Sequence, residues 1–150
     1  MSGHPFVLHR FAKLLAGLWA GMLIGLGAIG APAGFAVTTV EIAGRTAGRM
    51  FSIEAYVSLA AATLLLLLTR KAAAAEVDQP PVPALNTNLL LVLSTLFCTI
   101  VGYFVIQPMM AVARTGQGSL SFGALHGLSA GFFALKGLLV LSLAWRLTAR

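Results

Sequence analysis

Four long apolar stretches, separated by short polar segments, organise this chain. They cover residues 14–40, 50–69, 89–113 and 119–145. A helix needs about 20 predominantly apolar residues to cross the hydrocarbon core of a bilayer, and each stretch reaches that length. The pattern therefore predicts an all-α protein: an integral membrane four-helix bundle that forms a single transmembrane domain over residues 1–150.

Prolines mark where these helices should bend or end. Pro32 and Pro108 lie near the far ends of the first and third stretches. Proline lacks a backbone N–H group and its ring clashes with the preceding turn, so we expect a kink at each. Residues 72–85 join the second and third stretches and contain a proline-rich run at 80–83, which predicts an exposed, partly extended loop.

The first stretch has a second interpretation, a cleaved secretory signal, because the small residues at 31–36 resemble a cleavage site. The apolar part of a signal is about 7–15 residues long, and this stretch is far longer. A retained helix is therefore the favoured interpretation.

Composition supports the membrane assignment and excludes other classes. Hydrophobic residues make up 59% of the chain and charged residues 9%, against roughly 25% charged in soluble proteins. A soluble globular domain and a disordered chain are both excluded. The net charge is +6, but the basic residues stand singly or in pairs at the ends of apolar stretches. This distribution indicates contact with the lipid bilayer and no nucleic-acid surface.

The basic residues also predict an orientation. Six of them flank the termini and the central connection, and three lie in the other two connections. The six are Arg10, Lys13, Arg70, Lys71, Arg146 and Arg150, and the three are Arg45, Arg49 and Arg114. Since cytoplasmic segments carry the excess of Lys and Arg, both termini and the loop 72–85 are predicted to be cytoplasmic. Glu41 stands four residues before Arg45, a helical ion-pair spacing, and predicts a short helix at the outer surface over 41–50.

Two glycine ladders predict where helices approach closely. Glycine recurs every four residues on the first stretch and again on the fourth: Gly17, Gly21 and Gly25, then Gly123, Gly127 and Gly131. Membrane helices associate through small residues that let their backbones come close. We expect the ladders to form a contact between the first and fourth helices. The alternative is a contact with a second copy of the chain or with a membrane partner protein.

Polar residues inside the stretches are the candidate site, because a titratable side chain in hydrocarbon is costly. At about 1.5 Å per residue, Glu54, Gln107 and His126 are expected in one layer of the outer half, with Ser129 on nearly the same face as His126. Glu54, His126 and a methionine sulfur could form a soft site for copper or a haem ligand set, with His126 as the metal ligand.

Each candidate also has a plain structural interpretation. Glu54 lies near the outer end of its stretch and could pair with Arg49 at the membrane interface. A lone histidine in a helical bundle is more often a hydrogen-bonding group than a metal ligand. Lys136 lies deeper. Its long stem favours snorkelling to the cytoplasmic face over a bond to a backbone carbonyl or a role in an internal site.

Several chemical signatures are absent from the sequence. It has no phosphate-binding glycine loop, no HExxH and no serine nucleophile motif, so nothing favours a hydrolase, and an enzyme is not the favoured interpretation. Cys98 is the single cysteine and cannot form an internal disulfide. On this assignment no carboxylate lies near the middle of a helix, which argues against a proton-coupled antiporter of the small four-helix kind.

Short motifs resemble a known family. The motifs AGR at 43–45, AGRMFSIEAY at 47–56, HGLS at 126–129 and WAG at 19–21 resemble the bacterial domain-of-unknown-function family 4149, which is similar to the eukaryotic transmembrane protein 205 type. The resemblance covers nearly the whole chain. It implies four transmembrane helices, a His-x-x-Ser motif on the last one, and a place in the bacterial inner membrane.

The resemblance also implies a fold like that of copper-resistance D-like membrane proteins and of the haem-linked bacterial protoporphyrinogen oxidase. Those proteins hold metal or haem between helices. Carried over to this chain, this assigns His126, with Lys136 as a weaker second residue. Where the eukaryotic pattern has an asparagine about two turns after the histidine, this chain has Phe133.

Three functional hypotheses follow. The first is a protein that binds a metal ion, haem or a small apolar ligand within the bundle, at Glu54, Gln107, His126, Ser129 and Lys136. The second is an accessory protein that acts through helix–helix contacts with a partner or a second copy. The third is a small exporter that works as an oligomer, for which Lys136 is the deep titratable residue.

Overall fold

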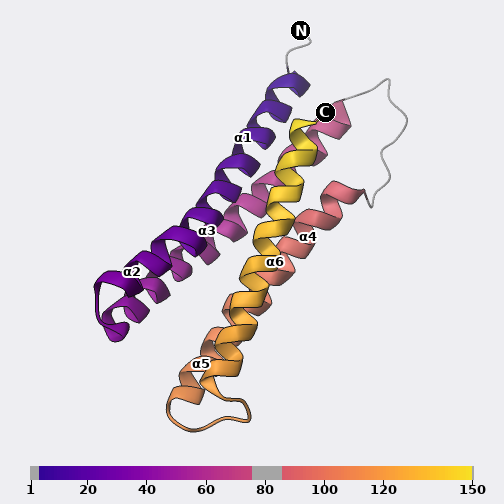
Figure 1. Cartoon of the computed structure of the whole chain (residues 1–150). Coiled ribbons are helices and arrows are strands. Elements are labelled where there is room, and N and C mark those ends of the chain that lie inside the picture. Colours follow the sequence, from indigo (N-terminus) through magenta and orange to yellow (C-terminus); the bar gives the residue numbers. More distant parts are fainter. Residues whose placement is uncertain (1–3, 76–85, 150) are drawn as a thin grey trace.

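The structure, a computed structural model, describes residues 4–75 and 86–149, and it is entirely helical over these residues apart from short connections. Four apolar helical segments are long enough to cross a membrane: Phe6–Val37, Val40–Lys71, Thr87–Arg114 and Phe122–Thr148. They pack side by side, and the first begins at the same end of the bundle at which the last one ends (Figure 1). The predicted all-α four-span membrane bundle is confirmed.

The first span consists of three consecutive helical segments. α1 (His4–Ile24) continues into the π-helical segment η1 (Gly25–Gly30) and then into α2 (Ala31–Val37), which contains Pro32 near its start. A local π-helical turn re-satisfies backbone groups that a proline in a membrane helix leaves free. The disturbance expected at Pro32 is thus a widened turn directly before it. α3 (Val40–Ala75) forms the second span without interruption.

The third span repeats this arrangement. α4 (Thr87–Thr99) continues into the π-helical segment η2 (Ile100–Val105) and then into α5 (Ile106–Arg114), which contains Pro108 near its start. α6 (Phe122–Thr148) forms the fourth span as one helix. Both prolines therefore follow a π-helical segment.

Side-chain caps set the start of α4 and of α6. The Asn86 side chain accepts a hydrogen bond from the Leu89 N–H at 2.9 Å. The Ser121 hydroxyl oxygen accepts one from the Ala124 N–H at 3.2 Å. Each cap satisfies one of the four N–H groups that have no partner at the start of a helix.

Two expectations about the second span are wrong. Residues 41–50 do not form a separate surface helix, because α3 already begins at Val40 and runs through them. The loop expected over 72–85 also begins later, since α3 continues to Ala75. The remainder of that loop, 76–85, with its proline-rich run, lies outside the described residues.

The four spans pack in a closed ring. α1 packs against α3 and α6, and α4 packs against the same two helices. α3 and α6 therefore face each other diagonally across the centre of the bundle. The described chain consists of two helical hairpins, hairpin 1 (residues 4–75) and hairpin 2 (residues 86–149).

The two hairpins pack on each other mainly in the half of the bundle near the chain ends. α2 packs on η1 and α3 within hairpin 1, and α5 packs on η2 and α6 within hairpin 2. At the opposite end from the chain termini, α2 and α5 stand apart (Figure 1). The hairpins thus diverge from the middle of the bundle towards α2 and α5.

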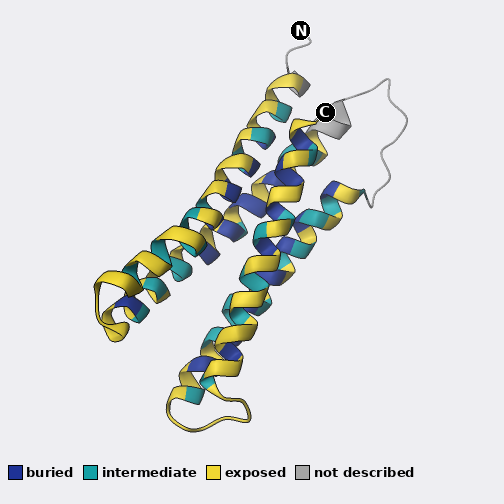
Figure 2. Cartoon of the chain, in the orientation of Figure 1, coloured by how far each residue is buried: buried dark blue, intermediate teal, exposed yellow. Residues whose placement is uncertain are grey.

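The surface is apolar and the interior contains polar residues, as in a protein that lipid surrounds. Large hydrophobic side chains such as Leu18 and Leu138 are 65% and 63% exposed, and exposed residues follow the outer face of every span (Figure 2). The main core combines residues from all four spans, including Trp19, Leu65, Val92 and Leu143. The buried polar residues among those described are Glu54, Ser58, Asn88, Thr95, Thr99 and Lys136.

The two glycine ladders lie on the outside of the bundle. Five of their six glycines are exposed and Gly25 is half-buried, and a Cβ atom placed on any of the six would meet nothing within 4 Å. α1 and α6 do pack together as expected, but through core residues such as Ala16, Ala20 and Val140. Within the chain, the ladders therefore do not form this contact. Contact with a second copy or a partner protein stays a prediction.

Candidate functional site

A buried ion pair lies at the centre of the bundle. The Lys136 ammonium on α6 donates hydrogen bonds to both carboxylate oxygens of Glu54 on α3, at 2.7 and 2.9 Å. Both residues are 3% exposed. Because α3 and α6 belong to different hairpins and stand diagonally opposite, this pair joins the two hairpins through the interior.

Two further side chains extend the pair into a polar chain, which we call the polar centre (Trp19, Ser58, Glu54 and Lys136). The Ser58 hydroxyl, one turn after Glu54 on α3, donates to the Glu54 carboxylate. The Trp19 indole N–H on α1 donates to the Ser58 oxygen at 2.9 Å. Three helices thus contribute to the polar centre, and each of its donors has an acceptor, as buried polar groups require.

Aromatic rings border the polar centre on the side where the hairpins diverge. The Lys136 ammonium nitrogen lies 5.2 Å from the centre of the Phe133 ring, within the range of a cation–π contact. Phe51 on α3 meets Phe133 edge-on, with ring centres 5.0 Å apart. Tyr56 and Phe104 form a similar contact between α3 and η2, at 5.4 Å, but Tyr56 is exposed and lies on the outer surface.

Glycines in the two π-helical segments receive consecutive phenylalanines of α6. A Cβ atom on Gly27 in η1 would lie 2.7 Å from the Phe133 ring, and one on Gly102 in η2 would lie 2.7 Å from the Phe132 Cβ atom. Both distances are too short for a real contact. The Phe132 Cβ atom is fixed to the α6 backbone, so position 102 requires glycine for this close approach, whereas the Phe133 ring beside Gly27 can shift. The side chain of Ser129 donates to the Gly102 carbonyl at 2.8 Å.

The position of Glu54 corrects the expectation for this residue. It stands fourteen residues after Val40 and seventeen before Lys71 in the second span, so it is central rather than terminal. Its partner is Lys136 and not Arg49, which is exposed. A carboxylate therefore does lie near the middle of a helix, and the argument against a proton-coupled antiporter loses its premise.

The position of Lys136 is also different from the favoured expectation. It stands fourteen residues after Phe122 and twelve before Thr148, and its side chain bonds to Glu54 rather than extending to a membrane surface. The expected snorkelling is therefore wrong, and a role of Lys136 in an internal site stays a prediction.

The other predicted site residues lie away from the polar centre. His126 is exposed on α6 and stacks on Phe122, with ring centres 5.8 Å apart. It precedes Lys136 by ten residues, which is about 15 Å along a helix. Gln107 is half-buried in α5, and Ser129 bonds to the η2 backbone. The structure thus brings together Glu54 and Lys136 and leaves His126 outside.

A copper site needs several donor side chains around one point, whereas a single axial histidine can hold a haem iron. Among residues 4–75 and 86–149, no three His, Cys, Asp or Glu side chains gather in this way. His126 faces outward beside Phe122, and Glu54 is already engaged by Lys136. The described residues therefore form no copper site of the kind that the fold resemblance implied.

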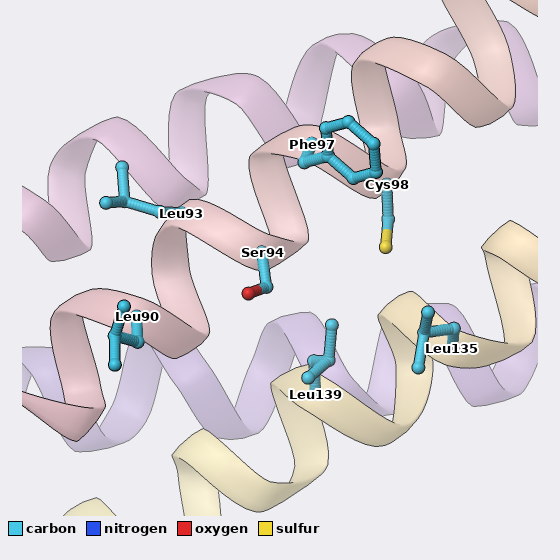
Figure 3. Close-up of a pocket in the computed structure, with 7 residues that line it drawn as sticks. All are labelled: Leu90, Leu93, Ser94, Phe97, Cys98, Leu135 and Leu139. Atoms are coloured by element: carbon cyan, nitrogen blue, oxygen red, sulfur yellow. The ribbon is translucent and has the colours of Figure 1, made fainter.

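A surface groove of about 420 Å³ lies between α4 and α6 (Figure 3). Its polar side chains are Ser94 and Cys98, and the rest of its lining is apolar. The lining residues are Leu90, Leu93, Ser94, Phe97, Cys98, Leu135 and Leu139. None of them is a member of the polar centre.

The sequence pattern did not identify Ser58 and Trp19 as site residues. It also did not predict that Glu54 pairs with Lys136. One signal for the pairing was available. Two opposite charges inside apolar stretches are each costly alone, and pairing with each other is the usual solution. The four-residue spacing from Glu54 to Ser58 also places both on one face of a helix. Nothing in the sequence indicated that Trp19 would reach Ser58.

Comparison with known protein families identifies the family of this chain. The family model described as "Domain of unknown function (DUF4149)" matches residues 14–119. The chain belongs to this family. DUF4149 is thus the family that the motifs at 43–56 resemble, and the match includes Trp19, Glu54 and Ser58, whereas His126 and Lys136 lie beyond it. No curated protein and no solved structure matches the chain.

Proposed function

We propose that this DUF4149 protein binds a small ligand inside the bundle, at the polar centre, and that binding opens the Glu54–Lys136 ion pair. The observation that carries the proposal is the pair itself, with both carboxylate oxygens engaged at 2.7 and 2.9 Å in the middle of a membrane bundle. An ionisable residue at this depth usually marks a binding or transport site.

Stability alone is a poor explanation for the pair. Removing two charges from water is expensive, and well-packed apolar residues in place of a buried ion pair are often neutral or stabilising. Core residues such as Leu65 and Val140 already pack the spans together. A pair that adds little stability is therefore better explained by a role in which it opens.

The architecture supports such a role. The pair connects α3 of hairpin 1 with α6 of hairpin 2, and the hairpins diverge towards α2 and α5 (Figure 1). Opening the pair removes the attraction between Glu54 and Lys136. This attraction acts at the level of the bundle where contact between the two hairpins ends. A ligand that competes for one of the two charges would therefore change the packing of hairpin 1 against hairpin 2.

Ligand extraction tests this proposal. The protein is purified gently from its native membrane, and its bound small molecules are identified by mass spectrometry. The matched control is the Glu54→Gln/Lys136→Met double variant, which removes both charges and nearly keeps both volumes. We expect a compound near stoichiometric amount in the wild type and its loss in the control, with thermal stability retained. The same compounds in both proteins at equal amounts would overturn the proposal.

A second candidate is a small exporter that works as an oligomer. The central position of Glu54 favours it, because such exporters need a deep titratable group. The exposed glycine ladders on α1 and α6 are suited to contact with a second copy or a partner protein. Under both candidates we propose the bacterial inner membrane as the location and a cytoplasmic position for both termini, on the basic residues that flank them.

A further inference from the structure

We propose that the ligand of the polar centre is a lipophilic monocation, an organic ammonium or related cation on an apolar body, which takes the place of the Lys136 ammonium at Glu54. This inference rests on the proposed function and names its ligand class. It follows from an asymmetry between the two charged partners.

Glu54 is the fixed partner. Its carboxylate also accepts the Ser58 hydroxyl hydrogen bond, and Ser58 is in turn held by the Trp19 indole on another helix. Ser58 is 0% exposed and Trp19 is 2% exposed. If the ion pair opens, two of the three helices around Glu54 still hold the carboxylate in place.

Lys136 is the movable partner. Its ammonium donates its hydrogen bonds to Glu54, and it also lies over the face of the Phe133 ring. A lysine side chain has a flexible four-carbon stem that can carry its charge elsewhere. A competing ligand therefore replaces the lysine more easily than the carboxylate, and it must carry a positive charge.

The surroundings of the ammonium match those of sites that recognise organic cations. Such sites combine a negative group with aromatic faces. Here the Glu54 carboxylate lies on one side of the Lys136 nitrogen, and the Phe133 ring lies 5.2 Å away with Phe51 packed against it. The lysine thus shows the position that a ligand cation takes up. The apolar residues around it select a ligand with an apolar body.

An anionic ligand fits less well. It would have to replace Glu54 at Lys136, and Glu54, which Ser58 and Trp19 hold in place, would remain buried without a positive partner. A buried charge without a partner is strongly unfavourable. The same cost does not arise when Lys136 leaves, because the incoming cation restores the charge at Glu54.

Equilibrium binding of two size-matched ions tests the inference. The probes are tetraphenylphosphonium, a cation, and tetraphenylborate, an anion of similar shape. Binding is measured with the full chain in nanodiscs, after subtraction of binding to empty nanodiscs. We expect saturable binding of the cation to the wild type. We expect at least tenfold weaker binding in Glu54→Gln, and at least tenfold tighter binding in Lys136→Met because the internal competitor is removed.

The variants include a safeguard against misfolding. If Glu54→Gln leaves Lys136 unpaired and the protein unfolds, the Glu54→Gln/Lys136→Met double variant supplies a carboxylate-free centre without a buried charge. Equal cation binding in all variants would overturn the inference, as would anion binding that depends on Lys136. In either case the ligand found by extraction still decides the proposed function, so the two failures can be told apart.

Discussion

At the scale of single residues, the two charges of the polar centre stabilise each other but add little to the stability of the folded protein. Glu54 and Lys136 are each 3% exposed, and a single charge at such a position costs several kcal/mol (roughly 3 or more) in a membrane helix. Their two hydrogen bonds of 2.7 and 2.9 Å offset this cost. Removing one partner is therefore far more damaging than removing both.

The first prediction concerns this difference. Lys136→Met should lower the free energy of unfolding by about 3–5 kcal/mol, because it leaves an uncompensated carboxylate in the interior. Adding Glu54→Gln to the same chain should restore most of the loss. Thermal unfolding in detergent measures both, with Lys71→Met at the exposed end of the second span as the control. An equal loss in the single and double variants would contradict the assignment.

The second prediction concerns the hydrogen bond from Trp19 to Ser58. Trp19→Phe keeps an aromatic ring in the core but removes the indole donor, so it should cost about 1 kcal/mol beyond the change in packing. A double-mutant cycle with Ser58→Ala isolates the bond. The two substitutions should cost less together than the sum of their separate effects. Strict additivity would mean that the bond at 2.9 Å contributes nothing.

At the scale of helical elements, two π-helical segments shape the middle of the bundle. η1 and η2 each precede a proline and each contain a glycine against which a phenylalanine of α6 packs. The phenylalanine beside η1 also lies next to the ammonium of Lys136. The glycines of the two irregular segments therefore leave room for Phe133 and Phe132 of α6, about one turn before Lys136. π-helical segments in membrane and soluble helices are frequently found at functional sites.

The third prediction tests these close approaches. In Gly102→Ala the new Cβ atom would lie 2.7 Å from the Cβ atom of Phe132, which is fixed to the backbone of α6 and cannot rotate away. Overpacking of this kind costs about 1–3 kcal/mol. Thermal unfolding should show this loss for Gly102→Ala. The matched control, Gly127→Ala, has open space at its Cβ position and should be neutral or slightly stabilising. The reverse order would refute the role given to η2.

At the scale of the whole molecule, apolar patterning was enough to predict the four spans and the membrane, but not the site. The depth of Glu54 was misjudged because the second stretch was taken to begin at 50. The three charged residues before it, Glu41, Arg45 and Arg49, belong to the same helix. The ion pair could not be derived from depth alone, because it also depends on how α3 and α6 are rotated about their axes. Rotation is set by packing among all four spans, and the glycine ladders pointed to the wrong faces.

The fourth prediction concerns these outward-facing ladders, which the bundle itself does not use. Membrane helices that expose glycine every four residues tend to associate with another helix through close backbone contact. Leucine at Gly21 or Gly127 meets no neighbour within the chain, so Gly21→Leu and Gly127→Leu should leave the thermal stability of the single chain almost unchanged. Both should weaken self-association in lipid bilayers, measured by energy transfer between labelled copies at increasing dilution. Leu18→Phe, a change at a lipid-exposed position beside the first ladder, is the control for added bulk. If the two leucine variants associate like the wild type, the ladders have no role in pairing copies, and a loss of thermal stability would show that they pack within the chain after all.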